Sequence, residues 1–281
     1  MGEENSSEKA LNFAIDLVRR TGHLLDVKTN SDLAWSGREP KARLDVQLQD
    51  FLMPALADSG IPVISEEAES PTDWRQARKV WIIDPLDGTL NHLRGSGPSA
   101  ISVALWGDGQ PLFGIVLDCA SRELAWGGRG FGARLGEQPI SVSDFREIAK
   151  ATLCTGIPSA FDWKDQASVS RLNQRMSAVA KVRMIGSAAS SLVLVARGAA
   201  EVYAEDSVRI WDVAAGLAIV EGAGGGFEMS RLSRDKVSIV AANGLLHGCF
   251  AKGACETDFE EDMFSSLVER ERVLPAFRPL V

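Results

Sequence analysis

Residues 81–91 of this chain read Trp81-Ile82-Ile83-Asp84-Pro85-Leu86-Asp87-Gly88-Thr89-Leu90-Asn91. The apolar start of this stretch is typical of a buried strand. Because Pro85 lacks an N–H and restricts the residue before it, we expect the strand to end at Asp84. Asp87 then lies in a tight turn, and Gly88 and Thr89 open a helix whose free N–H groups point toward the same place. Two carboxylates beside a helix N-terminus predict a site for a cation and an anion together.

The same stretch also has a purely structural interpretation. An Asp-Gly pair after a strand is usually only a turn, and Asp87 would then simply cap the helix. Two further acidic positions change that balance: Glu66 and Glu67 follow an apolar run, and Asp212 precedes an apolar helical run. Each of these alone is most often a solvated loop residue or a helix cap. Acidic residues thus recur at the ends of three predicted strands or helices. This recurrence favours the interpretation that they converge as ligands of one cation site.

Apolar periodicity and turn residues predict two coupled halves that divide near Ala149. In the first half we expect helices over residues 11–25, capped by Ser6 and Ser7, and 44–56, a loop over 31–41, and strands over 62–65, 80–84, 99–106, 112–117 and 123–126. The last three strands resemble a meander. In the second half we expect strands over 151–155, 182–185, 201–204, 226–229 and 238–241, alternating with helices over 166–181, 187–197, 212–221 and 258–270, the last capped by Thr257.

Composition narrows the class of protein. The chain has 281 residues, is 45% hydrophobic and 24% charged, and so fits a globular protein with a sizeable core. Its net charge of −8 disfavours binding to nucleic acid or to an anionic membrane surface. An acidic N-terminus, the lack of a long apolar run and four cysteines without metal-type spacing favour a cytoplasmic protein with reduced thiols. An anionic substrate would therefore need positive charge from another source.

The acidic motifs are similar to those of a known family. Ser-Glu-Glu at 65–67, Asp-Pro-Leu-Asp-Gly-Thr-x-Asn at 84–91 and Trp-Asp-x-Ala-Ala-Gly at 211–216 occur in that order. They resemble the inositol monophosphatase family of magnesium-dependent, lithium-sensitive phosphatases. The resemblance covers most of residues 61–226 and is weaker at both ends. It implies a five-layered α-β-α-β-α sandwich of the inositol monophosphatase and fructose-1,6-bisphosphatase type, generally dimeric, with metals between the halves 1–149 and 150–281.

Carried over position by position, the resemblance implies a site for two or three Mg²⁺ ions. The implied metal ligands are Glu66, Asp84, the backbone carbonyl of Leu86, Asp87 and Asp212. Such hard oxygen ligands suit Mg²⁺. The residues implied to activate water are Thr89, Asp45 and Glu66, although Lys41-Ala42 replaces the family's usual Val-Thr before that aspartate.

The resemblance also implies contacts to the substrate. These fall on Gly88, Thr89, Ala188, Glu205 and Asp212. Gly88 and Thr89 would donate N–H groups to the phosphate, and Glu205 would accept hydrogen bonds from hydroxyls of a sugar or cyclitol. His92 stands where the family commonly has phenylalanine, and we interpret it as a packing or rim residue.

The expected function is the Mg²⁺-dependent hydrolysis of a small phosphate monoester by a metal-activated water. Among the candidate substrates, the resemblance favours myo-inositol monophosphate most. The same metal core serves relatives that hydrolyse adenosine 3′,5′-bisphosphate, fructose 1,6-bisphosphate or histidinol phosphate, so these substrates stay open. A non-enzymatic regulator that binds a phosphometabolite or a protein is the alternative from another class. Lithium inhibition and a homodimer are further implications of the resemblance.

Overall fold

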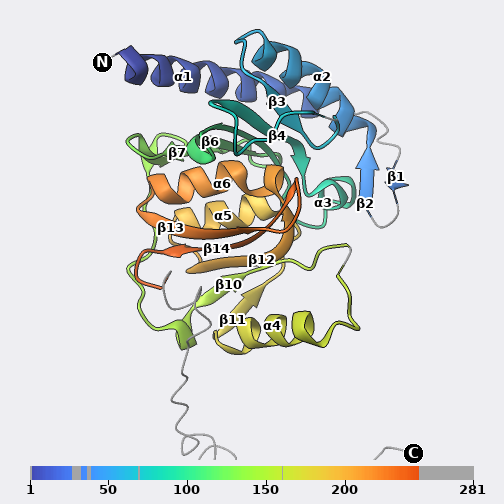
Figure 1. Ribbon diagram of the computed structural model, residues 1–281, viewed down its shortest axis with the longest axis vertical. Coiled ribbons are helices and arrows are strands. Elements are labelled where there is room, and N and C mark those ends of the chain that lie inside the picture. The colour runs from blue at the N-terminus through green and yellow to red at the C-terminus, as the bar shows by residue number, and fades with distance from the viewer. Residues whose placement is uncertain (1, 27–32, 37–38, 69, 160, 247–281) are drawn as a thin grey trace, which may run out of the picture.

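The computed structural model describes residues 2–26, 33–36, 39–68, 70–159 and 161–246. Helices and sheets alternate in five layers (Figure 1). The helices α1 (Gly2–Gly22) and α2 (Arg43–Ala57) cover the outer face of a seven-stranded sheet. The helices α5 (Ala188–Ala196) and α6 (Ile210–Gly222) lie between that sheet and a five-stranded one, whose far face is covered by α4 (Gln166–Ser177). The expected α-β-α-β-α sandwich is therefore confirmed.

The seven-stranded sheet has the order β3-β4-β5-β6-β7-β8-β9. Its strands are β3 (Val63–Ser65), β4 (Val80–Asp87), β5 (Ala100–Gly107), β6 (Gln110–Asp118), β7 (Leu124–Gly128), β8 (Gly132–Leu135) and β9 (Gln138–Pro139). The strands β3 and β4 are parallel, and every later pair is antiparallel. The predicted meander is confirmed, and it continues through β8 and β9.

The five-stranded sheet has the order β11-β10-β12-β14-β13. Its strands are β10 (Thr152–Cys154), β11 (Lys181–Arg183), β12 (Val202–Arg209), β13 (Gly225–Arg231) and β14 (Lys236–Asn243). Strand pairing is parallel from β11 through β12 and antiparallel from β12 through β13. The predicted alternation of strands and helices is confirmed here, with the helix that we predicted over 166–181 ending at Ser177. The predicted helix over 258–270, with its cap Thr257, lies outside the described residues.

The structure corrects two predictions near the N-terminus. Helix α1 begins at Gly2, before the expected caps Ser6 and Ser7, because serine inside a helix costs less than about 1 kcal/mol. The region 31–41, which we predicted as a loop, contains two short strands.

These two strands are β1 (Leu33–Ser36) and β2 (Glu39–Ala42), which pair antiparallel with Trp35 opposite Pro40. A proline at this position favours a loop in the sequence. A two-stranded ribbon consists only of edge strands, however, and an edge strand tolerates a missing N–H. The short helix α3 (Thr89–Arg94), which we predicted to open at Gly88 and Thr89, does follow β4.

Strand β4 passes through Pro85 and ends at Asp87, so the prediction that it ends at Asp84 is wrong. Asp84 pairs with Ser102 and Asp87 pairs with Ala100, with a register shift between the two pairs. The extra residue forms a β-bulge, which leaves the ladder unpaired at the point where proline has no N–H to give. Both carboxylates therefore project from one strand in the middle of the protein.

Apolar packing follows the layers. The largest cluster lies between the two sheets and includes most of α6, which is apolar all round, as expected for a buried helix. A second cluster joins α1 and α2 to the outer face of the larger sheet through residues such as Leu17, Leu48 and Trp81. In the described part of the chain, no helix is both long and apolar enough to cross a membrane.

The strand β6 and the helix α6 approach each other most closely at Gly114. A Cβ atom there would lie only 2.2 Å from the backbone oxygen of Ala215. We expect Gly114→Ala to lower the free energy of unfolding by at least about 1–3 kcal/mol, the usual cost of overpacking a core. Gly244→Ala is the matched control, because its Cβ would lie 3.5 Å from the nearest atom. Denaturant unfolding measures both variants, and equal small effects would contradict this prediction.

Candidate metal and phosphate site

Three carboxylates from three separate elements meet in the structure. Glu66 follows β3, Asp84 lies in β4, and Asp212 lies in the first turn of α6. One oxygen of each carboxylate lies within 4.8 Å of the corresponding oxygens of the other two. Asp84 is only 1% exposed, while Glu66 and Asp212 are half-buried. The fold thus brings together three of the predicted metal ligands across about 150 residues of sequence.

Burial and like charge shape the protonation of this cluster. Burial raises the pKa of Asp84 well above its usual range, and repulsion from the neighbouring carboxylates, Glu66 first, adds to the shift. Burial also raises the pKa of Asp212 well above its usual range, followed by repulsion from Asp87 and Glu66. Buried charges of one sign are costly unless an opposite charge compensates them. The cluster therefore has the electrostatics of a cation site.

The chemistry of the donors fits Mg²⁺. The group of three contains only carboxylates, and hard oxygen ligands select hard divalent cations. Leu86, the predicted backbone ligand, is tied to the cluster because its N–H donates to Asp84 Oδ1 at 2.9 Å. Its carbonyl oxygen accepts from Thr89 Oγ1 at 3.0 Å, so the carbonyl lies next to the predicted catalytic threonine.

Asp87, the remaining predicted ligand, lies outside the group of three and has protein partners of its own. Its Oδ2 atom accepts hydrogen bonds from Ser187 Oγ at 2.5 Å and from the Ala189 N–H at 2.8 Å. Burial raises its pKa to about 6, although these hydrogen bonds oppose the shift. Asp87 is near enough to raise the pKa values of Asp84 and Asp212. It therefore links the acidic cluster to the N-terminus of α5.

The predicted pair of Thr89 and Asp45 is also brought together. Thr89 Oγ1 lies 3.1 Å from Asp45 Oδ1, and Asp45 Oδ2 accepts from the Ala42 N–H at 2.6 Å. Burial raises the pKa of Asp45 to about 6. Gly88 has φ = 81°, a left-handed conformation that favours glycine, and a Cβ there would lie 2.9 Å from the Pro98 oxygen. The turn between β4 and α3 thus depends on this glycine.

Glu205 and Ala188 line a smaller pocket of about 260 Å³, which Asp87 and Asp212 also reach. Glu205 Oε2 accepts from the Tyr203 hydroxyl at 2.9 Å. Burial raises the pKa of Glu205 to about 7, with the hydrogen bond from Tyr203 opposing the shift. A half-buried carboxylate in this position can accept hydrogen bonds from a ligand, so the predicted substrate contact lies in a cavity of suitable chemistry.

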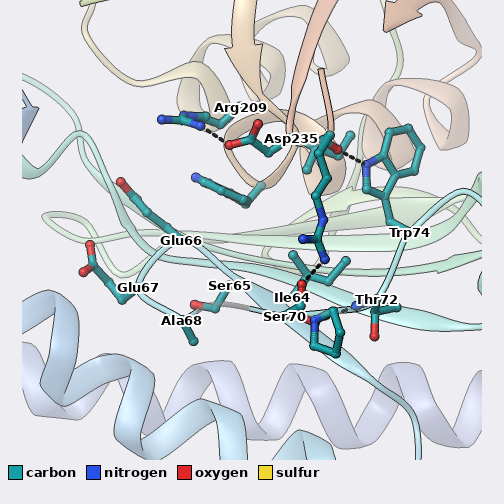
Figure 2. A pocket seen from close by; sticks show the side chains of 14 residues that line it. Ile64, Ser65, Glu66, Glu67, Ala68, Ser70, Thr72, Trp74, Arg209 and Asp235 are labelled. Carbon is teal, nitrogen blue, oxygen red and sulfur yellow. Dashed lines mark hydrogen bonds and ion pairs between the residues drawn. The ribbon is translucent and has the colours of Figure 1, made fainter. Parts of the chain in front are cut away.

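Glu66 also lines a larger cleft of about 930 Å³. Figure 2 shows Glu66 and Glu67 on one wall and the ion pair of Arg209 and Asp235 on the opposite wall. Arg234 connects the turn between β13 and β14 to the segment between β3 and β4, because its guanidinium donates to the Ser70 oxygen and its carbonyl accepts from Trp74 Nε1. The cleft gives solvent a route toward the acidic cluster.

Sequence reasoning did not assign roles to several residues that hold the site together. Ser187, which caps α5, and Tyr203 orient two of the predicted acidic residues. The serine could have been found as a cap before an apolar helical run. The tyrosine also has a sequence signal, because residues two apart in a strand lie on the same face, which places Tyr203 beside Glu205. His92 Nδ1 lies 3.1 Å from Ser99 Oγ, and His92 is not in the group of three carboxylates.

The fold and this buried acidic cluster define a layered α/β protein with a candidate metal centre. The model of the inositol monophosphatase family matches residues 6–257, so the chain belongs to this family. A Nus factor SuhB of Xylella fastidiosa is 37% identical over 148 residues, which cover 53% of this chain and 54% of that relative. This chain thus matches about half the length of that relative.

Two further relatives carry enzyme names. An inositol-1-monophosphatase of Rhizobium meliloti is 35% identical over 178 residues, which cover 63% of this chain and 66% of the relative. The structure of an inositol monophosphatase from Anabaena superimposes with a TM-score of 0.75 at 26% identity, covering 88% of this chain and 95% of the other. These similarities support the expected fold over nearly the whole described chain.

The raised pKa values predict how the stability of the metal-free protein depends on pH. The pKa values of Asp45 and Asp87 rise from 3.8 to about 6 in the folded state. Their protonated forms therefore stabilise the fold fully below about pH 4, and this contribution is lost as the pH rises through about 6. We expect the chelated protein to lose unfolding free energy over this window, measured by denaturant unfolding at several pH values.

Asp206 and Asp235 provide an internal contrast, because their pKa values are lowered. Their stabilisation is lost only as the pH falls below their unfolded value, about 4, and so lies outside the window. A metal-free stability that stays flat or rises between about pH 4 and 7 would contradict the assignment of a repulsive acidic cluster.

Proposed function

We propose that this protein hydrolyses a small phosphate monoester with the help of Mg²⁺, and that myo-inositol monophosphate is its first substrate. The observation that supports the proposal best is the convergence of Glu66, Asp84 and Asp212 within 4.8 Å. Three acidic residues from separate elements gain nothing by lying together unless they bind a cation. Membership of the inositol monophosphatase family supports the same chemistry.

In this proposal the carboxylates of Glu66, Asp84, Asp87 and Asp212, with the Leu86 carbonyl, hold two or three ions. Bound Mg²⁺ supplies a coordinated water of lowered pKa and neutralises charge on the phosphate. Asp45 holds the Thr89 hydroxyl, which has one proton and two acceptors, Asp45 Oδ1 and the Leu86 oxygen. When that proton points to Asp45 Oδ1, the Thr89 oxygen keeps lone pairs that can accept a hydrogen bond from a water.

Substrate selection is proposed to come from the smaller pocket. Gly88 and Thr89 donate backbone N–H groups to the phosphate, while Ala188 and Glu205 face the rest of the substrate. A cyclitol or a sugar presents several hydroxyls that need acceptors, and Glu205 supplies one. This favours a polyol over a purine, although the bisphosphate and histidinol phosphate alternatives share the metal core.

The alternative class is a regulator that binds a phosphometabolite or a protein without catalysis. Two relatives carry the name Nus factor SuhB, and this name is the observation that favours the alternative. The complete set of proposed metal ligands favours the enzyme, because a purely binding role would not need it. We further propose a cytoplasmic homodimer inhibited by Li⁺, with the chain divided into the halves 1–149 and 150–281.

Removal of the metal tests the proposal directly. We expect phosphate release from myo-inositol 1-phosphate to stop in excess chelator and to return with Mg²⁺. Asp84→Asn should fold and lose at least about a hundredfold in turnover, because it removes a central carboxylate. The exposed Asp50→Asn on α2 is the matched control and should keep full activity. Undiminished activity in chelator, or a fully active Asp84→Asn variant, would contradict the proposed metal-dependent mechanism.

Glu205→Gln tests the proposed polyol contact. We expect turnover of inositol phosphate to weaken by about 1–3 kcal/mol, the scale of a lost hydrogen bond to a charged group. Hydrolysis of a simple aryl phosphate, which has no hydroxyls to bind, should be spared. Glu228→Gln, an exposed change on β13, serves as the control. Equal losses on both substrates would mean that Glu205 supports the metal site instead.

A further inference from the structure

The smaller pocket contains a cationic wall to which the proposed function gives no role. Asp87 and Asp212 lie at its metal end, Glu205 lines it, and Arg209 and Lys236 contribute positive charge. A monophosphate bound at the metal end would need no lysine elsewhere in the pocket. The two basic residues therefore require an explanation of their own.

Arg209 and Lys236 are direct cross-strand partners in β12 and β14. Like charges in this arrangement destabilise a sheet. The pairing results from a register shift in β12, since the pairs Glu205–Ile239 and Val208–Val237 differ by one residue. Continuation of the first register would instead place Arg209 opposite Asp235, a favourable pairing of opposite charges. The irregularity thus creates a repulsive pair at the pocket.

Only one of the two charges is compensated by a carboxylate. Arg209 forms an ion pair with Asp235 and lies over the Trp211 ring, 5.6 Å from its centre. Lys236 is half-buried, and its ammonium group makes no hydrogen bond or ion pair with any other described residue. A partly buried ammonium group without an anion is unfavourable. Lys236 is therefore a basic residue of the pocket that forms no ion pair with any carboxylate of the described chain.

Ser207 adds a second donor to this wall. It lies in the irregular stretch of β12 with φ = 63°, a left-handed conformation that costs a non-glycine residue about 1 kcal/mol or more. Ser207 lines the pocket, and its hydroxyl makes no hydrogen bond to the rest of the described chain. Two residues whose donor groups have no hydrogen-bond partner in the described chain, Ser207 and Lys236, thus line one cavity.

We propose that Lys236 and Ser207 bind a second anionic group of the substrate, a phosphate or carboxylate other than the one that is hydrolysed. The proposal rests on the proposed function, and it adds that a polyol ester with two acidic groups is preferred to one with a single phosphate. An ammonium and a hydroxyl are both good donors to such oxygens. Glu205, in the same pocket, remains the acceptor for hydroxyls.

Binding measurements test this subsite separately from catalysis. The probes are the 1-phosphonate and the 1,4-bisphosphonate of myo-inositol, which cannot be hydrolysed, titrated calorimetrically into the full-length protein with Mg²⁺. We expect the bisphosphonate to bind about tenfold or more tightly than the monophosphonate. Lys236→Met should remove this difference and leave binding of the monophosphonate unchanged, whereas Lys236→Arg should keep most of it. Ser207→Ala should reduce it in part.

Lys181→Met, an exposed change on β11, is the matched control and should keep the preference. If Lys236→Met weakens both probes equally, the lysine binds the hydrolysed phosphate and the proposal is overturned. It is also overturned if the wild-type protein shows no preference for the bisphosphonate. The proposed function has a separate test. If it is wrong, the wild-type protein will release no phosphate from inositol 1-phosphate with Mg²⁺.

Discussion

Ionised carboxylates that lie within 4.8 Å of one another repel, and the elements around them must be rigid enough to hold them in place. Asp84, which is almost fully buried, is the centre of this repulsion. It lies in the second strand of a seven-stranded sheet, while Asp212 projects from a helix buried between two sheets. A large apolar core therefore supplies the stabilisation that offsets an unfavourable cluster, as is typical of sites where function and stability compete.

Irregular strands recur on both sides of this cluster. The bulge in β4 lies between Asp84 and Asp87, and the shift in β12 lies between Glu205 and Val208. A regular strand alternates its side chains between two faces, so neighbouring residues cannot all face one site. An extra residue resets this alternation and aims further side chains at the same space. The two irregularities thus increase the density of polar groups around the acidic cluster.

The acidic residues of the site were predictable because they occur in short motifs with turn residues at fixed offsets. The layered α/β class was predictable as well, since helical and strand periodicities alternate along the chain, whereas the order of the five layers followed from the resemblance to the family. The hairpin of β1 and β2 was not, because the sequence rule for proline cannot distinguish an edge strand from a loop. Nor could the partners of the site be predicted: Ser187 reaches Asp87 across 100 residues, a contact that only the packing of α5 creates.

The layers and the site depend on each other through α6. This helix begins at Ile210 and carries Asp212 in its first turn, so the position of Asp212 follows that of the helix as a whole. The helix is fixed against the larger sheet by the close approach of Ala215 to Gly114 and by the hydrogen bond from Trp106 Nε1 to the Ala214 oxygen. That sheet also carries Asp84 in β4. Because a packed interior transmits small displacements, any change that separates α6 from β6 should move Asp212 away from Asp84 and weaken the cation site.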